Sequence, residues 1–179
     1  KKVKETPFNI LFSNTETLLP ATYSQVPRPV VQRRFKDEDT IGKFAAQAGT
    51  RVLEFLLDTN VISELRHGKP NQSMAVRNWA AGQASSGLFL SAITILELEL
   101  GIQALERRTP PQGSALRAWL TGVRAAFADR ILSFTESTAP VCAALHIPNP
   151  HGERDAMIAA TAIEHQFTVV TRNVSDFAD

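Results

Sequence analysis

The sequence contains one cysteine, Cys142, so no disulfide can form within the chain, as is typical of proteins from a reducing compartment. It has no apolar run long enough to cross a bilayer, and no apolar segment of a secretory signal follows its basic first residues. A glycine-rich phosphate loop is also missing, which argues against nucleoside triphosphate chemistry. Neither a serine–histidine–aspartate nor a cysteine–histidine arrangement has supporting sequence context.

Charge of one sign is not in excess either. The net charge is +1, and 44% of the 179 residues are hydrophobic, which allows one domain, or one domain and an appendage. A balanced charge does not indicate a nucleic-acid-binding protein, but a nuclease with an acidic site and a basic rim has the same balance. We expect a soluble cytoplasmic protein whose function has to be inferred from its motifs.

Residues 1–50 differ in composition from the rest of the chain. They contain four prolines and a basic stretch with Arg28, Arg33 and Arg34, and only the segment at 41–48 is amphipathic. This segment of the chain has too little apolar surface for a core of its own, so we expect an extended arm that lies on another surface. A disordered or foreign extension is the alternative interpretation.

From residue 51 onward, apolar runs typical of strands alternate with segments of helical periodicity. Such alternation predicts an α/β fold, in which helices cover both faces of a central parallel sheet in three layers. The predicted strands are 53–57, 88–90, 131–134 and 168–170, and the predicted helices are 59–66, 73–84, 92–106, 116–127, 137–145 and 155–165.

The apolar run Phe55–Leu57 is followed at once by Asp58, and a short helical pattern begins after it. A carboxylate in this place lies at the carboxyl end of a buried strand, where open parallel sheets bind their ligands. A role as helix cap alone is the alternative, because aspartate is a common residue before a first helical turn.

Three more acidic residues fall at comparable places. Glu97 lies in the first turns of the helix after the second strand, Asp155 opens an apolar helix, and Asp176 follows the last strand. Glu97 also has apolar neighbours on both sides, which is an expensive position for a charge without a role. Asp155 serving only a helix dipole and Asp176 serving only a turn remain alternatives.

Four carboxylates in one crevice raise one another's pKa and destabilise the fold, unless a cation neutralises them. Carboxylate and water are the ligands that Mg²⁺ and Mn²⁺ prefer. A site of this kind activates water and clamps the oxygens of a phosphodiester during in-line displacement. The carboxylates alone therefore favour a metal-dependent phosphodiesterase.

Four segments, 56–64, 90–101, 155–162 and 171–177, resemble in order the motifs of the PIN domain, and most closely those of bacterial toxins of the VapC and FitB type. The resemblance covers about residues 53–179. It implies a PIN-like fold and a metal-dependent endoribonuclease, the toxin of a toxin–antitoxin system, which is silenced by a cognate antitoxin (VapB- or FitA-like) and is usually a homodimer.

The resemblance also implies roles for individual residues. Asp58, Glu97 and Asp155 match the acidic metal-site residues, and Asn60 and Thr94 match polar positions beside them. The fourth acidic position is either Asp176 or the position of Asn173, because many relatives carry an acid directly after the threonine–arginine pair. Thr171 and Arg172 are the remaining candidates for contacts to the RNA or to the metal-binding side chains. Arg154 is a further candidate for contact with phosphate. For both arginines, a solvated side chain without such a role is the alternative.

This chain departs from the PIN pattern at both ends. The arm is extra, and relatives usually continue past the pair Asp176–Phe177 into one more strand. Because antitoxins often place an arginine among the toxin's carboxylates, Arg28, Arg33 or Arg34 of the arm could do the same within this chain. A non-catalytic PIN-like module that binds RNA or protein is the first alternative function, and a phosphatase or DNA nuclease is the second.

Overall fold

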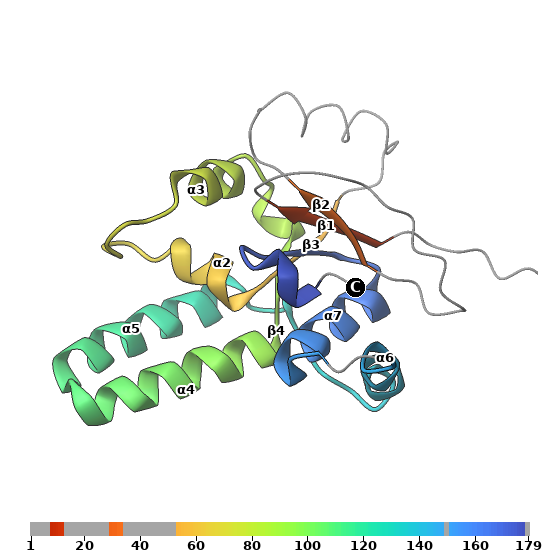
Figure 1. Ribbon diagram of the computed structural model, residues 1–179. Coiled ribbons are helices and arrows are strands. Elements are labelled where there is room, and N and C mark those ends of the chain that lie inside the picture. The colour runs from red at the N-terminus through yellow and green to blue at the C-terminus, as the bar shows by residue number, and fades with distance from the viewer. Residues whose placement is uncertain (1–7, 13–28, 34–52, 149–150, 178–179) are drawn as a thin grey trace, which may run out of the picture.

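The structure, a computed structural model, describes residues 8–12, 29–33, 53–148 and 151–177, and for the first two segments it describes the backbone alone. In these parts of the chain, six strands form a parallel sheet in the order β2-β1-β6-β3-β4-β5 (Figure 1). The strands are β1 (Phe8–Phe12), β2 (Pro29–Arg33), β3 (Phe55–Leu57), β4 (Leu88–Ser91), β5 (Ile131–Leu132) and β6 (Thr168–Val170). No helix among the described residues is both long and apolar enough to span a membrane.

Helices cover both faces of this sheet, so the predicted three-layer α/β/α architecture is confirmed (Figure 1). One face packs against α2 (Thr59–Glu64), α3 (Met74–Ala81), α4 (Ala92–Arg108) and α5 (Pro110–Ala126). The other face packs against α7 (Glu153–His165) and the short 3₁₀ helix η2 (Val174–Phe177), and α6 (Thr138–Leu145) packs beside α7. A second 3₁₀ helix, η1 (Ser85–Gly87), precedes β4.

The central strand β3 explains why the chain turns where it does. Leu56 points into one apolar cluster and Phe55 and Leu57 into the other, and all three are at most 4% exposed. Each buried side chain of this size contributes roughly 1.5–3 kcal/mol. The ring of Trp79 packs edge-on against Phe55 at a centroid distance of 5.3 Å, so Trp79 is part of the core on this face of the sheet.

Several of the predicted element bounds differ from the structure. The helix predicted at 116–127 begins at Pro110, because proline is tolerated in a first helical turn, and the helix predicted at 59–66 ends at Glu64. The helix predicted at 73–84 ends at Ala81, because Gly82 caps it. The strand predicted at 131–134 is only Ile131–Leu132, because its partner β4 ends where α4 begins. Helix α7 begins at Glu153, so Asp155 lies within its first turn and does not open it.

The backbone of β1 extends the sheet beyond β6, with Leu11 opposite Val170, and β2 pairs along β1. Since all these strands are parallel, their carboxyl ends lie at the same edge of the sheet as the end of β3. The predicted segment at 41–48, Arg28 and Arg34 lie outside the described residues. The division into an arm and a domain, and the placement of an arm arginine among the carboxylates, stay predictions.

Candidate functional site

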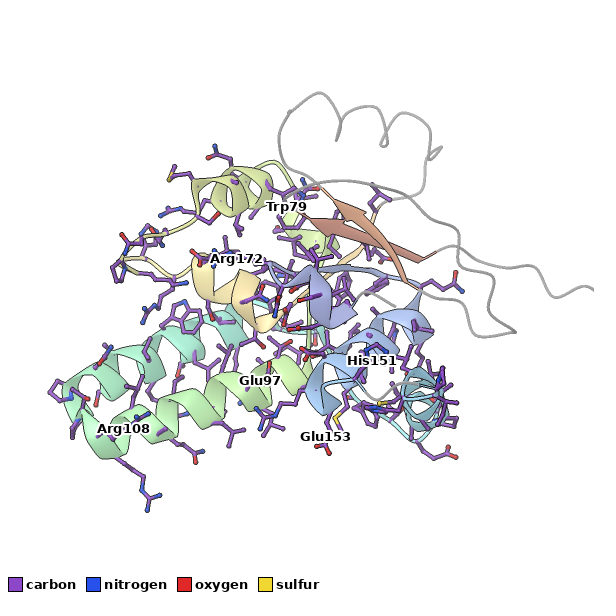
Figure 2. All side chains as sticks on the ribbon, viewed as in Figure 1. Trp79, Glu97, Arg108, His151, Glu153 and Arg172 are labelled. Carbon is purple, nitrogen blue, oxygen red and sulfur yellow. The ribbon has the colours of Figure 1, made fainter. Side chains whose placement is uncertain are left out.

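The four carboxylates singled out in the sequence line one open pocket of about 590 Å³. Asp58 follows β3, Glu97 projects from α4, Asp155 lies in the first turn of α7, and Asp176 lies in η2. Figure 2 shows oxygen atoms gathered between α2, α4 and η2, where Glu97 is labelled. Side chains from four separate elements thus meet at the carboxyl edge of the sheet, as the strand-end rule predicts.

Asp58 is buried, with 4% of the residue exposed, and both of its oxygens accept hydrogen bonds from neutral groups. Oδ1 accepts the backbone N–H of Thr59 at 2.5 Å, and Oδ2 accepts Nδ2 of Asn60 at 2.6 Å and the hydroxyl of Thr171. Asp58 is therefore the N-cap of α2 and a pocket carboxylate at once. The two interpretations drawn from the sequence do not compete.

The environment of Asp58 disfavours its charged form. Burial, with a smaller contribution from the negative charges of Asp155 and Glu97, raises the pKa of Asp58 to about 6, although the hydrogen bonds from Thr171 and Thr59 lower it. Burial, followed by the charges of Asp176 and Glu97, also raises the pKa of Asp155. The negative charge of the pocket is thus only partly compensated, by the guanidinium of Arg154.

Asn60 connects the start of α2 to the segment after β6. Its Nδ2 donates to Oδ2 of Asp58 and, at 2.8 Å, to the hydroxyl oxygen of Thr171. Its Oδ1 accepts the backbone N–H of Arg172 at 2.8 Å. The side-chain amide therefore has a fixed orientation, and it holds one oxygen of Asp58 in place.

Glu97 is oriented from two sides. Its Oε2 accepts the hydroxyl of Thr59, and its Oε1 lies 3.7 Å from Nη1 of Arg154. Of the apolar neighbours of Glu97 in the sequence, Leu96 and Leu100 are 46% and 43% exposed, so they do not enclose the Glu97 carboxylate. The helix turns these two residues toward solvent, and the Glu97 side chain is itself 21% exposed at the pocket wall.

Asp176 lines the pocket, whereas Asn173 lies behind it. Nδ2 of Asn173 donates to Oδ2 of Asp176, and the hydroxyl of Ser175 lies 3.4 Å from the other oxygen, Oδ1. Of the two candidates for the fourth acidic position, Asp176 thus reaches the pocket and Asn173 supports it.

Arg154, like Asn60, lines the pocket, whereas Thr94, Thr171 and Arg172 lie around it and not in its wall. Thr94 is fully buried, its backbone N–H donates to the hydroxyl oxygen of Ser91 at 2.9 Å, and its hydroxyl reaches the carbonyl oxygen of Leu57 at 3.4 Å. Thr171 contacts Asp58 directly, and the guanidinium of Arg172 points to Glu64. Thr94 therefore braces the end of β3, while Thr171 holds a pocket carboxylate.

Four contributors to the site were not singled out in the sequence: Thr59, Ser63, Glu64 and Gly152. Thr59 and Ser63 line the pocket, and their spacing of four residues on α2 would have placed them on one helix face. Gly152 precedes α7, and a Cβ there would lie 2.5 Å from Oδ2 of Asp155, so a larger residue would displace this carboxylate from its present position. The glycine three residues before Asp155 was the available signal.

The donors of the pocket suit a hard divalent cation, because they are carboxylate, amide and hydroxyl oxygens. Burial is the main cause of the raised pKa values of Asp58 and Asp155, and the repulsion that adds to it is what a cation would relieve. Within the described residues, no three acidic, histidine or cysteine side chains yet converge closely enough to enclose a metal ion. The chemistry of these donor groups fits a divalent cation.

The sequence profile of the PIN domain matches residues 55–179. The chain is 40% identical over 131 residues to VapC ribonuclease Y4jK of Sinorhizobium fredii and 37% identical over 128 residues to toxin FitB of Neisseria gonorrhoeae, each match covering 68% of this chain and 89% of the relative. The crystal structure of FitAcB from Neisseria gonorrhoeae superimposes with a TM-score of 0.61 at 37% identity, covering 69% of this chain and 90% of the other.

Proposed function

This chain belongs to the PIN domain family, and we propose that it is a metal-dependent endoribonuclease, the toxin of a toxin–antitoxin pair. The observation that carries the proposal is the convergence of four carboxylates from four elements on one open pocket. A relative at 40% identity is named a ribonuclease, and a second, at 37% identity, is named a toxin. Hydrolysis of an RNA phosphodiester bond is the reaction that fits both the names and the pocket.

We propose that Asp58, Glu97, Asp155 and Asp176 hold a divalent cation, Mg²⁺ or Mn²⁺. When bound, such a cation lowers the pKa of a water and neutralises charge on the phosphate oxygens. Asp58 suits the role of a permanent ligand, because Asn60 and Thr171 fix its Oδ2 and the backbone of Thr59 fixes its Oδ1. Asp176 suits the same role, since Asn173 holds its carboxylate at the pocket.

Glu97 is the carboxylate best placed to accept a proton from the attacking water. It is more exposed than Asp58, and the hydroxyl of Thr59 fixes the direction of one of its oxygens. Arg154 lines the same pocket with 53% of its side chain exposed, so its guanidinium can bind a phosphate oxygen of the RNA while it faces Glu97. In this proposal Glu97 accepts the proton of the water and Arg154 binds the phosphate, and both side chains line one pocket.

The partner we propose is a cognate antitoxin protein. Relatives of similar fold have been crystallised as FitAB and FitAcB, at 35% and 37% identity to this chain, and the former is bound to DNA. We propose that the chain acts in the cytoplasm, as a homodimer, and that an antitoxin covers its pocket until released. Residues 1–50 remain a candidate for an arm with the same effect in cis, and their removal is expected to raise the activity.

The test is cleavage of a mixed pool of structured RNAs by the purified protein in Mg²⁺, Mn²⁺ or EDTA. Asp58→Asn removes one charge from the pocket, and Asp129→Asn is the matched control, because Asp129 is exposed in a left-handed turn that asparagine tolerates. We expect metal-dependent cutting that Asp58→Asn abolishes and Asp129→Asn retains. Absence of cutting in every metal, also after removal of residues 1–50, would overturn the nuclease and leave a binding module.

A further inference from the structure

Glu64, the last residue of α2, is the most buried charged residue among those described, with 1% exposed, and the proposed reaction does not use it. Its Oε1 accepts Nζ of Lys69 at 2.5 Å and Nη1 of Arg172, and its Oε2 accepts the backbone N–H of Ser73 at 2.8 Å. A buried carboxylate needs such partners to offset its lost hydration. Glu64 therefore ties together three segments of the chain.

One of these segments is part of the carboxylate pocket. Arg172 lies between Thr171, whose hydroxyl donates to Asp58, and Asn173, whose amide donates to Asp176. The residues on both sides of Arg172 thus touch pocket carboxylates, while its own side chain reaches Glu64. A shift of Arg172 would move both neighbours and, with them, the support of Asp58 and Asp176.

Helix α2 holds Arg172 at two points. Asn60 accepts its backbone N–H, and Glu64 binds its guanidinium. The two residues are four apart and so lie on the same face of the helix. Figure 2 shows Arg172 beside α2, on the side of α3. The bond from Asn60 holds the backbone of Arg172, and the contact with Glu64 adds an anchor for its side chain.

We infer that Glu64 is a positioning residue that acts through Arg172: it fixes the segment after β6 on α2 and so sets where Asp176 stands at the carboxylate pocket. Since this pocket is the site of the proposed ribonuclease, the inference rests on that function. Lys69 shares the carboxylate of Glu64 but touches no pocket residue in the described contacts. A substitution of Lys69 therefore removes the contact of Glu64 with the α2–α3 loop and leaves its contact with Arg172, which separates the two roles of Glu64.

The experiment measures amide hydrogen exchange of the full chain without metal or RNA, by mass spectrometry of peptides. The variants are Glu64→Gln, Arg172→Gln and the double variant, with Lys69→Gln as the matched control on the same carboxylate. We expect peptides covering 171–177 to exchange roughly 10-fold faster in all three, in excess of any change in β3 and α7. The double variant should equal the single ones, because both substitutions break one contact.

A second readout is Mn²⁺ affinity, measured by calorimetry on the same proteins. We expect it to fall about 10–100-fold in Glu64→Gln and Arg172→Gln and to stay unchanged in Lys69→Gln, since outer partners of metal ligands have effects of this size. Equal effects of Lys69→Gln, or faster exchange spread evenly over all peptides, would overturn the inference and leave Glu64 a structural residue.

The two proposals fail in different ways. Should Glu64→Gln not fold, Arg172→Gln carries the test, because half of the Arg172 side chain is exposed. Exchange changes confined to 171–177 in a protein that cuts no RNA would uphold the positioning role and refute the ribonuclease. Metal-dependent cutting of RNA, with unchanged hydrogen exchange and Mn²⁺ affinity in both variants, would uphold the ribonuclease and refute the positioning role of Glu64.

Discussion

Two buried carboxylates lie at the two ends of one short helix, and their electrostatic environments are opposite. Asp58 caps the start of α2 and Glu64 ends it, with 4% and 1% of each residue exposed. Asp58 accepts hydrogen bonds from neutral groups and faces two negative charges, which together with burial raise its pKa to about 6. Hydrogen bonds from Lys69 and from the backbone of Ser73, and the charge of Arg172, lower the pKa of Glu64 against the effect of burial.

The difference separates a structural charge from a functional one. Glu64 is neutralised by side chains of its own chain, so it contributes to stability without any ligand. Asp58 is held in place but not neutralised, which costs stability and leaves the pocket open to a cation from outside. Burial alone does not distinguish Asp58 from Glu64, because both are almost fully buried. The sign of the neighbouring charges distinguishes them.

Removing the charge of Asp58 should have the largest effect on the contrast between Asp58 and Glu64. Asp58→Asn keeps the shape of the side chain but deletes a proposed ligand, so we expect RNA cleavage to fall by more than about 100-fold, beyond the loss that outer partners of metal ligands produce. Cleavage rates at saturating Mn²⁺ are the measurement. Activity within a few-fold of the wild type would remove Asp58 from the site.

The same side chain should also give the stability a distinctive pH dependence. The folded-state pKa of Asp58 is about 6 and the ordinary pKa of an aspartate is 3.8, so the folded protein binds more protons than the unfolded chain between these pH values. Without metal, stability should therefore decrease by about 2 kcal/mol as pH rises from 4 to 7, and Asp58→Asn should flatten this slope. Urea unfolding at several pH values checks this, against the opposite contribution of Glu64, whose lowered pKa stabilises the fold at neutral pH and whose contribution is lost as pH falls through the acidic range.

A bound metal ion should reduce the decrease in stability with rising pH, because its positive charge offsets the negative charge of the ionised carboxylates. Since a cation binds the ionised carboxylates of the folded state, we expect Mn²⁺ to raise the melting temperature more at pH 7 than at pH 5. Equal shifts at both pH values in the wild type, or an undiminished shift in Asp58→Asn, would show binding elsewhere.

Removing the carboxylate of Glu64 should damage the fold itself. Glu64→Ala leaves Lys69 and Arg172 without their anion, and a broken buried pair costs 3–5 kcal/mol when fully enclosed. The two cations are 27% and 48% exposed, so we expect a loss on the order of 2 kcal/mol in urea unfolding at pH 7. Glu106→Ala removes an exposed partner of Arg117 and should leave the unfolding midpoint where it is.

Much of this arrangement could be predicted from the sequence, because short-range signals determine it. The run Phe55–Leu57 before Asp58 identifies a central strand, and the rule that ligands bind at the carboxyl ends of parallel strands brings Asp58 and Asp155 together. The family resemblance and the three-layer fold are confirmed. The roles of the four carboxylates stay predictions.

The remaining features depend on pairs that no local pattern predicts. Glu64 and Arg172 are 108 residues apart, and only the folded chain shows that they meet. The exposure of Leu96 and Leu100 was missed because α4 carries apolar residues on several faces, so periodicity did not reveal the buried one. The choice between Asn173 and Asp176 depended on a 3₁₀ turn too short to have a period.

The smallest expected effect concerns Thr59, which touches both sides of the pocket: its backbone N–H donates to Asp58 and its hydroxyl to Glu97. Thr59→Val keeps the backbone bond and the shape and removes only the hydroxyl. If Glu97 accepts the proton of the attacking water, loss of this single orienting bond, of about 1.5 kcal/mol for a charged acceptor, should reduce kcat roughly 10-fold with little change in KM. Thr59→Ser, which restores the hydroxyl, should recover the rate. A fall in Mn²⁺ affinity with unchanged kcat would instead show that Glu97 acts only as a metal ligand. This variant therefore distinguishes a proton acceptor from a metal ligand at a single carboxylate of the pocket.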